Sequence, residues 1–153
     1  MNQSHFKSLV IKQMILDVDE KIHLSKGQIS SISQSKSSAT KSSAGDKHET
    51  GRAMMERELA MAEFQLQKAL HQKADIENLQ KATQVEGVVG YGSLVHASTG
   101  FFLLGIGLGK VITDSAMCFA ISSASPIGKA ISGKMVGDEI EFNSSKIEIL
   151  SIT

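Results

Sequence analysis

Residues 11–32 read IKQMILDVDEKIHLSKGQISSI, and side chains suited to a helix interface recur in this stretch in alternating steps of four and three residues. Such spacing is the seam of a coiled coil, in which one stripe of each helix packs against another helix. Residues 55–76, MERELAMAEFQLQKALHQKADI, repeat the same steps. The seam positions are Ile11, Ile15, Val18, Ile22, Ser25, Ile29 and Ile32, then Met55, Leu59, Ala62, Leu66, Ala69, Lys73 and Ile76. Two long helices are therefore predicted.

A segment rich in Ser and Thr, residues 35–44, interrupts the chain between the two seams. An antiparallel hairpin pairs positions whose numbers have a constant sum, and pairs such as Ile29 with Met55 and Val18 with Leu66 both sum to 84. This places the turn near Ser42, inside the interruption. We expect an antiparallel coiled-coil hairpin over residues 1–80, with arms of roughly 30 residues that reach on the order of 45 Å. Pairing of each seam with another chain is the open alternative.

The pattern changes after Gln84, where Gly, Val, Ile, Phe and Ser become frequent. Short strands are predicted near residues 88–89, 93–95, 101–106, 118–121, 139–142 and 146–152. Ser125 and Pro126 have the residue types of an N-cap and a first helical position, so one short helix should begin there and end at Gly133. The sequence therefore predicts an α+β protein whose residues 81–153 form a small β-rich domain.

Composition excludes several classes of protein. Sixteen Lys and Arg balance sixteen Asp and Glu, so no global field draws the chain to nucleic acid or to an anionic membrane. The single Cys118 cannot form an internal disulfide, and the N-terminus has no pattern of a secretory signal. The most apolar segment, residues 100–112, is too short to span a bilayer. We expect a cytoplasmic protein without a membrane partner, and a monomer, because a closed hairpin leaves little need for another helix.

The predicted tip carries two carboxylates, Asp46 and Glu49, which are three residues apart and would lie on neighbouring positions of one helical turn. Asp followed three residues later by Glu is also close to a capping box, which is the purely structural interpretation. Two exposed carboxylates could instead hold one face of a hydrated Mg²⁺, with further ligands from a partner. Lys41, Lys47 and Arg52 surround the pair, either as a solvated surface or as contacts to a nucleic-acid backbone.

Other candidate residues give weaker signals. Cys118 lies in an apolar predicted strand and is best interpreted as a small core residue. Gly105, Gly107 and Gly109 precede no clear helix, so we interpret them as strand ends and turns rather than as a phosphate-binding loop. The five His residues have no metal-ligand spacing.

Two segments near the C-terminus, SPIGKA at residues 125–130 and GKMVGDEI at residues 133–140, resemble the C-terminal signature of the Gre family of bacterial transcription elongation factors. That family has an acidic hairpin tip of the form Gly-Asp-x-x-Glu, to which Gly45, Asp46 and Glu49 are similar. The order of hairpin and then β-rich domain agrees as well, so the resemblance covers nearly the whole chain.

The resemblance implies an FKBP-like C-terminal domain that docks on RNA polymerase at the rim of its secondary channel, while the coiled coil enters the channel. The residues matching the docking signature are Ser125, Pro126, Ile127, Gly128 and Lys129. Asp46 and Glu49 would then help to bind a Mg²⁺ shared with the polymerase, near the 3′ end of the transcript RNA. Lys41, Lys47 and Arg52 would lie close to nucleic acid. The chain would not be an enzyme itself but would stimulate cleavage of backtracked transcript by the polymerase.

One departure from the family pattern motivates a second hypothesis. Family members typically continue after the tip glutamate with Asn-Ala-Glu-Tyr, whereas this chain has Thr50, Gly51, Arg52 and Ala53. A regulator that occupies the channel without promoting cleavage fits this change. A prolyl isomerase is suggested only by the implied fold, and the absence of Trp and scarcity of aromatic residues argue against it. A generic coiled-coil scaffold is the fourth possibility.

Overall fold

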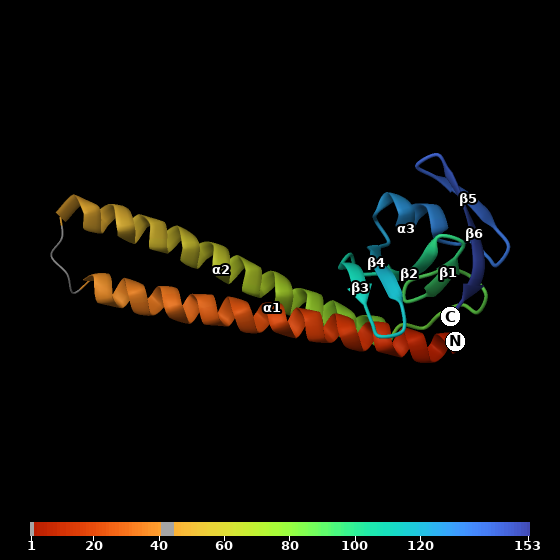
Figure 1. The fold of residues 1–153 in the computed structure, drawn as a ribbon, viewed down its shortest axis with the longest axis horizontal. Coiled ribbons are helices and arrows are strands. Elements are labelled where there is room, and N and C mark those ends of the chain that lie inside the picture. Colours follow the sequence, from red (N-terminus) through yellow and green to blue (C-terminus); the bar gives the residue numbers. More distant parts are fainter. Residues whose placement is uncertain (1, 41–44) are drawn as a thin grey trace. The chain divides into compact units, whose positions relative to one another are not determined.

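The computed structural model describes the chain except residues 1 and 41–44, and it describes only the backbone of residues 36, 38–40 and 45–48. Figure 1 shows two long helices followed by strands and a short helix. The elements are α1 (Gln3–Thr40), α2 (Gly45–Gln80), β1 (Leu94–Ala97), β2 (Gly100–Gly105), β3 (Gly109–Ile112), β4 (Met117–Ser122), α3 (Pro126–Ile131), β5 (Glu139–Phe142) and β6 (Ser145–Ile152). Two compact units result: Asp17–Lys73, here called the arm, and Met1–Leu16 with Ala74–Thr153, here called the base.

The arm is a pair of antiparallel helices held by a single seam (Figure 1). Val18, Ile22 and Ser25 of α1 are buried, as are Ala62 and Ala69 of α2. The remaining seam positions of the arm are half-buried: Ile29, Ile32, Met55, Leu59, Leu66 and Lys73. The predicted helical hairpin and the helix faces that form it are therefore confirmed.

The pairing between the two helices differs from the expected one. Lys73 Nζ lies 2.7 Å from Asp19 Oδ1, and these residue numbers sum to 92 rather than 84. A groove along the arm likewise sets Ser31 and Ile32 beside Glu58 and Met61. The expected pairing was thus wrong by about one heptad. If one helix is shifted along the other by seven residues, every seam position again faces the partner helix. The seam pattern alone therefore cannot distinguish the two pairings.

The polar interruption begins later than predicted. Residues 35–40 belong to α1, which ends only at Thr40, although they are mostly Ser and Thr. Ser and Thr are only moderately poor helix formers, and helix formation is cooperative, so a long packed helix extends through them. The predicted turn position, Ser42, lies outside the described residues.

The base contains a six-stranded sheet with the strand order β3-β4-β2-β1-β6-β5. Only β2 and β4 run parallel, and the other neighbours are antiparallel. β5 matches its predicted range, and residues Asn143 and Ser144, whose φ angles are positive, form a tight hairpin to β6. The strand expected at residues 88–89 is only an isolated bridge from Val88 to Met135. β3 was not predicted, because its glycine at residue 109 was interpreted as part of a turn.

Both faces of this sheet are covered near its centre. Side chains alternate along each strand, so Val95 and Leu104 point to one face and Leu94 and Leu103 to the other. Val95 and Leu104 belong to the core that α3 closes with Ile131. On the other face the buried Phe6 of α1 packs edge-on against Phe101, with ring centroids 4.7 Å apart. The sheet therefore holds the beginning of α1 and α3 on opposite sides.

α3 begins as predicted. The Ser125 hydroxyl accepts a hydrogen bond from the backbone N–H of Gly128 at 3.1 Å, and Pro126 occupies the first helical turn. α3 ends at Ile131, shortly before Gly133, whose φ of 78° suits glycine. Within the described residues, none of the helices is both long and apolar enough to cross a membrane.

Candidate functional site

The acidic pair lies where α2 begins. α2 starts at Gly45, so Asp46 and Glu49 are the second and fifth residues of the helix, and Glu49 is exposed. Residues three apart on a helix are neighbours on its surface, so the backbone brings these two positions together. Negative charge is favourable at a helix N-terminus, so acidic residue types suit these two positions whatever else they do.

Several predicted tip residues cannot be assigned contacts. Lys41 lies outside the described residues, and the side chains of Asp46 and Lys47 do too, although the backbone of both is helical. The capping-box and metal-binding interpretations of Asp46 therefore both remain predictions. Because α2 already includes Gly45, Asp46 is a residue of the first turn rather than the residue before it.

Arg52 is described and pairs with an acid of its own helix. Its Nε lies 3.6 Å from Glu56 Oε1, one turn further along α2. Both side chains are about half exposed, with 51% and 53% of their surface accessible, so the pair is weak and solvent competes for it. Arg52 is thus accessible to a partner. Its ion pair with Glu56 must break before all of its guanidinium N–H groups can donate to a phosphate.

The tip has the right ligand chemistry for Mg²⁺ but too few ligands. Carboxylate oxygens are the donors that Mg²⁺ prefers, and the exposed Glu49 is free to turn toward a partner. Among the described side chains, no group of three His, Cys, Asp or Glu is close enough to hold a metal ion. A metal at Asp46 and Glu49 would therefore need further carboxylates or phosphates from another molecule.

The SPIG segment has a structural explanation within the base. The Ser125 hydroxyl caps α3 and also donates to the Ser122 carbonyl oxygen at 2.6 Å. Gly128 is buried, and a Cβ there would overlap the same Ser122 carbonyl. Ile127 packs against the core. Of the five predicted docking residues, only Pro126 and Lys129 are exposed to a partner.

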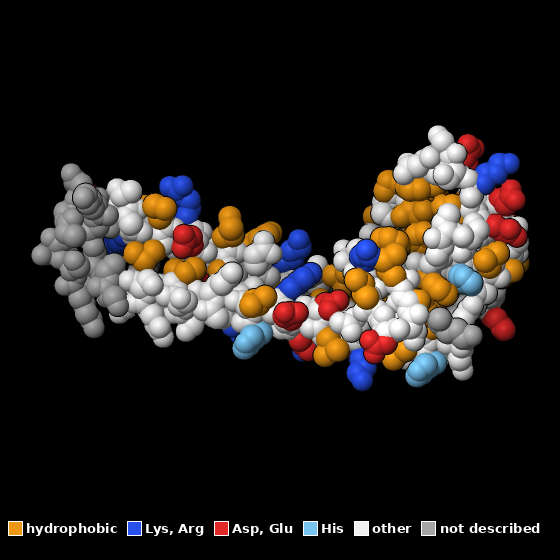
Figure 2. Space-filling view, in the orientation of Figure 1, with side chains coloured by type: hydrophobic (Ala, Val, Ile, Leu, Met, Phe, Trp, Pro, Cys, Tyr) orange, Lys and Arg blue, Asp and Glu red, His pale blue; other side chains and the backbone are white. Residues whose placement is uncertain are grey.

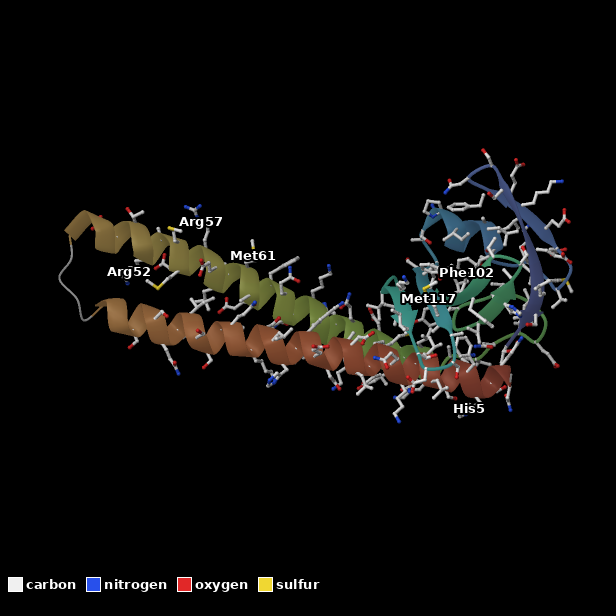
Figure 3. The ribbon with its side chains drawn as sticks, viewed as in Figure 1. His5, Arg52, Arg57, Met61, Phe102 and Met117 are labelled. Carbon is white, nitrogen blue, oxygen red and sulfur yellow. The ribbon has the colours of Figure 1, made fainter. Side chains whose placement is uncertain are left out.

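Sequence reasoning missed an apolar surface on the same face of the sheet as α3. Phe102 and Phe119 stack with ring centroids 6.1 Å apart, and the neighbouring Met117 and Ile112 are exposed. Figure 3 shows Phe102 and Met117 close together on this part of the base, and Figure 2 shows hydrophobic side chains gathered there. We call these four residues the sheet patch. Apolar residues at successive positions 117–121 were the available signal, since a strand with one solvated face alternates with polar residues.

Cys118 belongs neither to the acidic tip nor to the sheet patch. Its thiol is buried in β4, and this burial raises its pKa to about 12. The nucleophilic form of cysteine is the thiolate, so at neutral pH this side chain is an inert core residue, as the sequence predicts.

Comparison of the chain with protein-family models, with curated protein sequences and with solved structures finds no match. The roles of three features therefore have to be inferred from the chemistry of their residues: the tip carboxylates, the α3 turn and the sheet patch.

Proposed function

We propose that this chain is a Gre-type transcription elongation factor, which inserts its arm into the secondary channel of RNA polymerase and stimulates cleavage of backtracked transcript. The observation that carries the proposal is the placement of Asp46 and Glu49 among the first five residues of α2, at the end of a two-helix hairpin. A pair of carboxylates at the end of a narrow helical pair can reach an active site that a globular surface cannot enter.

The base supports the proposal as a docking domain. A six-stranded sheet that closes a core against the short α3 is compatible with the FKBP-like fold that the resemblance implies. Pro126 and Lys129 are exposed on α3, and the sheet patch lies on the same face of the sheet. An apolar centre beside a cationic side chain is the usual composition of a protein interface. We assign polymerase docking to α3 and the sheet patch together.

In the proposed mechanism the chain completes a site that the polymerase largely provides. Asp46 and Glu49 would hold a Mg²⁺ together with carboxylates of the polymerase, and this ion would supply Lewis-acid activation for transcript hydrolysis. Glu49 can also accept a hydrogen bond from a water molecule and orient it. Lys41, Lys47 and Arg52 are in the right part of the chain to neutralise phosphates of the transcript 3′ end. The chain is then an accessory factor and not an enzyme.

The decisive experiment is transcript cleavage by a backtracked bacterial RNA polymerase complex in Mg²⁺. The variant Asp46→Asn, Glu49→Gln keeps the size of both side chains and removes their charge. We expect stimulation of cleavage to fall on the order of 100-fold, since removal of one positioned electrostatic group in an active site commonly costs that much. Binding to polymerase, measured by competition with labelled wild-type protein, should change less than threefold.

A control neutralises a second acidic pair, elsewhere on α2. Glu58→Gln with Glu63→Gln removes two exposed carboxylates of the arm and should leave cleavage intact. Loss of polymerase binding in the tip variant, or equal cleavage by wild-type and variant proteins, would contradict the metal-directed role of the tip.

A second candidate function is a regulator that occupies the channel without promoting cleavage. The ion pair between Arg52 and Glu56 favours it, because the position typically acidic in the family here carries a cation held by its own helix. Tight polymerase binding without cleavage, together with changed initiation rates, would establish this candidate in place of the first.

A further inference from the structure

A second stripe of large side chains runs along α2, apart from the buried seam. Met54, Arg57, Met61, Phe64 and Lys68 follow one another in steps of three and four residues. The three apolar members are 56%, 68% and 65% exposed. Figure 3 shows Arg57 and Met61 projecting from the side of α2 that faces away from α1. We call these five residues the outer stripe.

The outer stripe is unlike an ordinary solvated helix face. Single exposed apolar residues are normal, but three at heptad spacing within 11 residues, 54–64, repeat the pattern that makes a coiled-coil seam. The neighbouring positions Ala53 and Ala60 are exposed and small. Small side chains beside an apolar stripe let a second helix approach closely, whereas a solvated face would normally carry Lys or Glu there.

The charges of the outer stripe have one sign. Arg57 and Lys68 lie within the stripe, and in the described part of the arm neither has a carboxylate within ion-pairing distance. Figure 2 shows Lys and Arg side chains, and acidic ones as well, among the hydrophobic side chains along the arm. A partner with acidic side chains beside an apolar stripe would be complementary in both respects.

We infer that the outer stripe docks a helix of RNA polymerase, whose apolar side chains pack on Met54, Met61 and Phe64 and whose carboxylates pair with Arg57 and Lys68. This inference rests on the proposed function and deepens it, since it names a contact made by the arm besides the chemistry of its tip. The occupant then adds a third helix to the arm and holds the hairpin in one orientation.

The spacing favours a helix over single-stranded nucleic acid as the occupant. Nucleic-acid grooves use successive aromatic platforms on which bases stack, whereas two of the three apolar residues here are methionines. Methionine is flexible and suits apolar packing against another helix. Binding of RNA is therefore an outcome to be tested rather than the expectation.

The test measures the affinity of full-length protein for purified bacterial RNA polymerase. Met61→Ser with Phe64→Ser should weaken binding about tenfold or more, because buried aromatic and apolar anchors carry most interface energy. The control, Leu24→Ser, removes a side chain of α1 that is 57% exposed. It should bind within threefold of wild-type protein. A second pair, Arg57→Glu with Lys68→Glu, should also weaken binding, while Lys21→Glu with Lys26→Glu on α1 should not.

Circular dichroism and thermal melting check that stripe and control variants fold alike. Equal polymerase affinities of stripe and control variants would overturn the inference and leave the proposed function standing. If the wild-type protein does not bind RNA polymerase, both this inference and the proposed function are wrong. If the stripe variants lose affinity for a free single-stranded RNA oligonucleotide, the occupant is RNA and the inference is wrong. If they turn a dimer into a monomer in sedimentation, the occupant is a second copy of this chain and the inference is wrong as well.

Discussion

The base and the arm bury their apolar side chains in different ways. In the base, β2 has Leu103 buried on one face of the sheet and Leu104 on the other, so this central strand is packed from two sides. In the arm, a single seam of α1 and α2 is buried, and its centre consists of small residues such as Ser25, Ala62 and Ala69. The arm therefore has far less hydrophobic stabilisation for each residue than the base.

This difference suits the arm and the base to different roles. A thin two-helix arm leaves most of its surface free, which is a cost for stability but useful for the channel insertion that we propose. The base, with its sheet covered near the centre and its capped helix α3, is the part that can hold a rigid docking surface. The comparison predicts that local opening is concentrated in the arm.

The largest expected effect contrasts the two cores directly. Leu103→Ala should lower the free energy of unfolding of the base by about 4 kcal/mol, because the cavity is enclosed on all sides. Ile22→Ala should cost the arm about 2 kcal/mol, since a two-helix seam open to solvent can partly collapse around the change. Amide hydrogen exchange followed for each unit would measure both values. Equal losses of unfolding free energy in the two variants would show that the arm and the base are packed equally well.

Gly128→Ala tests how tightly α3 is set on the sheet. The added Cβ overlaps the Ser122 carbonyl oxygen, so backbone must shift, and we expect a loss of about 3 kcal/mol in the base. Gly27→Ala is the control in the arm, where nothing lies within 4 Å of the new atom, and it should stabilise α1 slightly. Urea unfolding of each variant gives the values, and a tolerated Gly128→Ala would disprove the close approach.

The α3 cap should have a smaller effect. Ser125→Ala removes the hydroxyl that accepts from the Gly128 N–H and should cost about 1 kcal/mol. Ser125→Asp restores an acceptor and should recover most of that loss in thermal melting. If Ser125→Ala instead abolishes polymerase binding while stability changes by this small amount, the residue contacts the partner as well as capping the helix.

The smallest effect tests the pairing of the arm helices. A double-mutant cycle with Asp19→Asn and Lys73→Gln should give a coupling of about 0.5 kcal/mol, which is typical of an exposed ion pair. This coupling should vanish in 1 M salt. The pairing first expected from the seams sets Lys73 opposite Ile11, so absence of coupling to Asp19 at low salt would reinstate it.

Much of the fold follows from local rules that act within a few residues. The two seams, the hairpin they form and the start of α3 at Ser125 and Pro126 each depend on spacing or on a cap that is complete within one or two turns. For the candidate site, the same local rules place Asp46 and Glu49 in one helical turn. The helix boundary at Thr40 was missed because cooperativity along a packed helix outweighs the weak propensities of Ser and Thr.

Features that depend on contacts distant in sequence required the tertiary structure. β3 and the parallel pairing of β2 with β4 arise from neighbours that the residues of each strand do not specify. The sheet patch is exposed because α3 covers one part of that face and not the other. The unbroken apolar run at residues 117–121 indicates an apolar face but not whether a helix covers it.

The amino-acid order alone thus determines which faces of α1 and α2 meet, because helical periodicity carries that information in every heptad. It does not determine how far one helix slides along the other, since each slide of seven residues buries an equivalent stripe. The structure selects the pairing in which Asp19 meets Lys73, where specific side chains across the seam differ in fit and charge even though the pattern of apolar positions repeats.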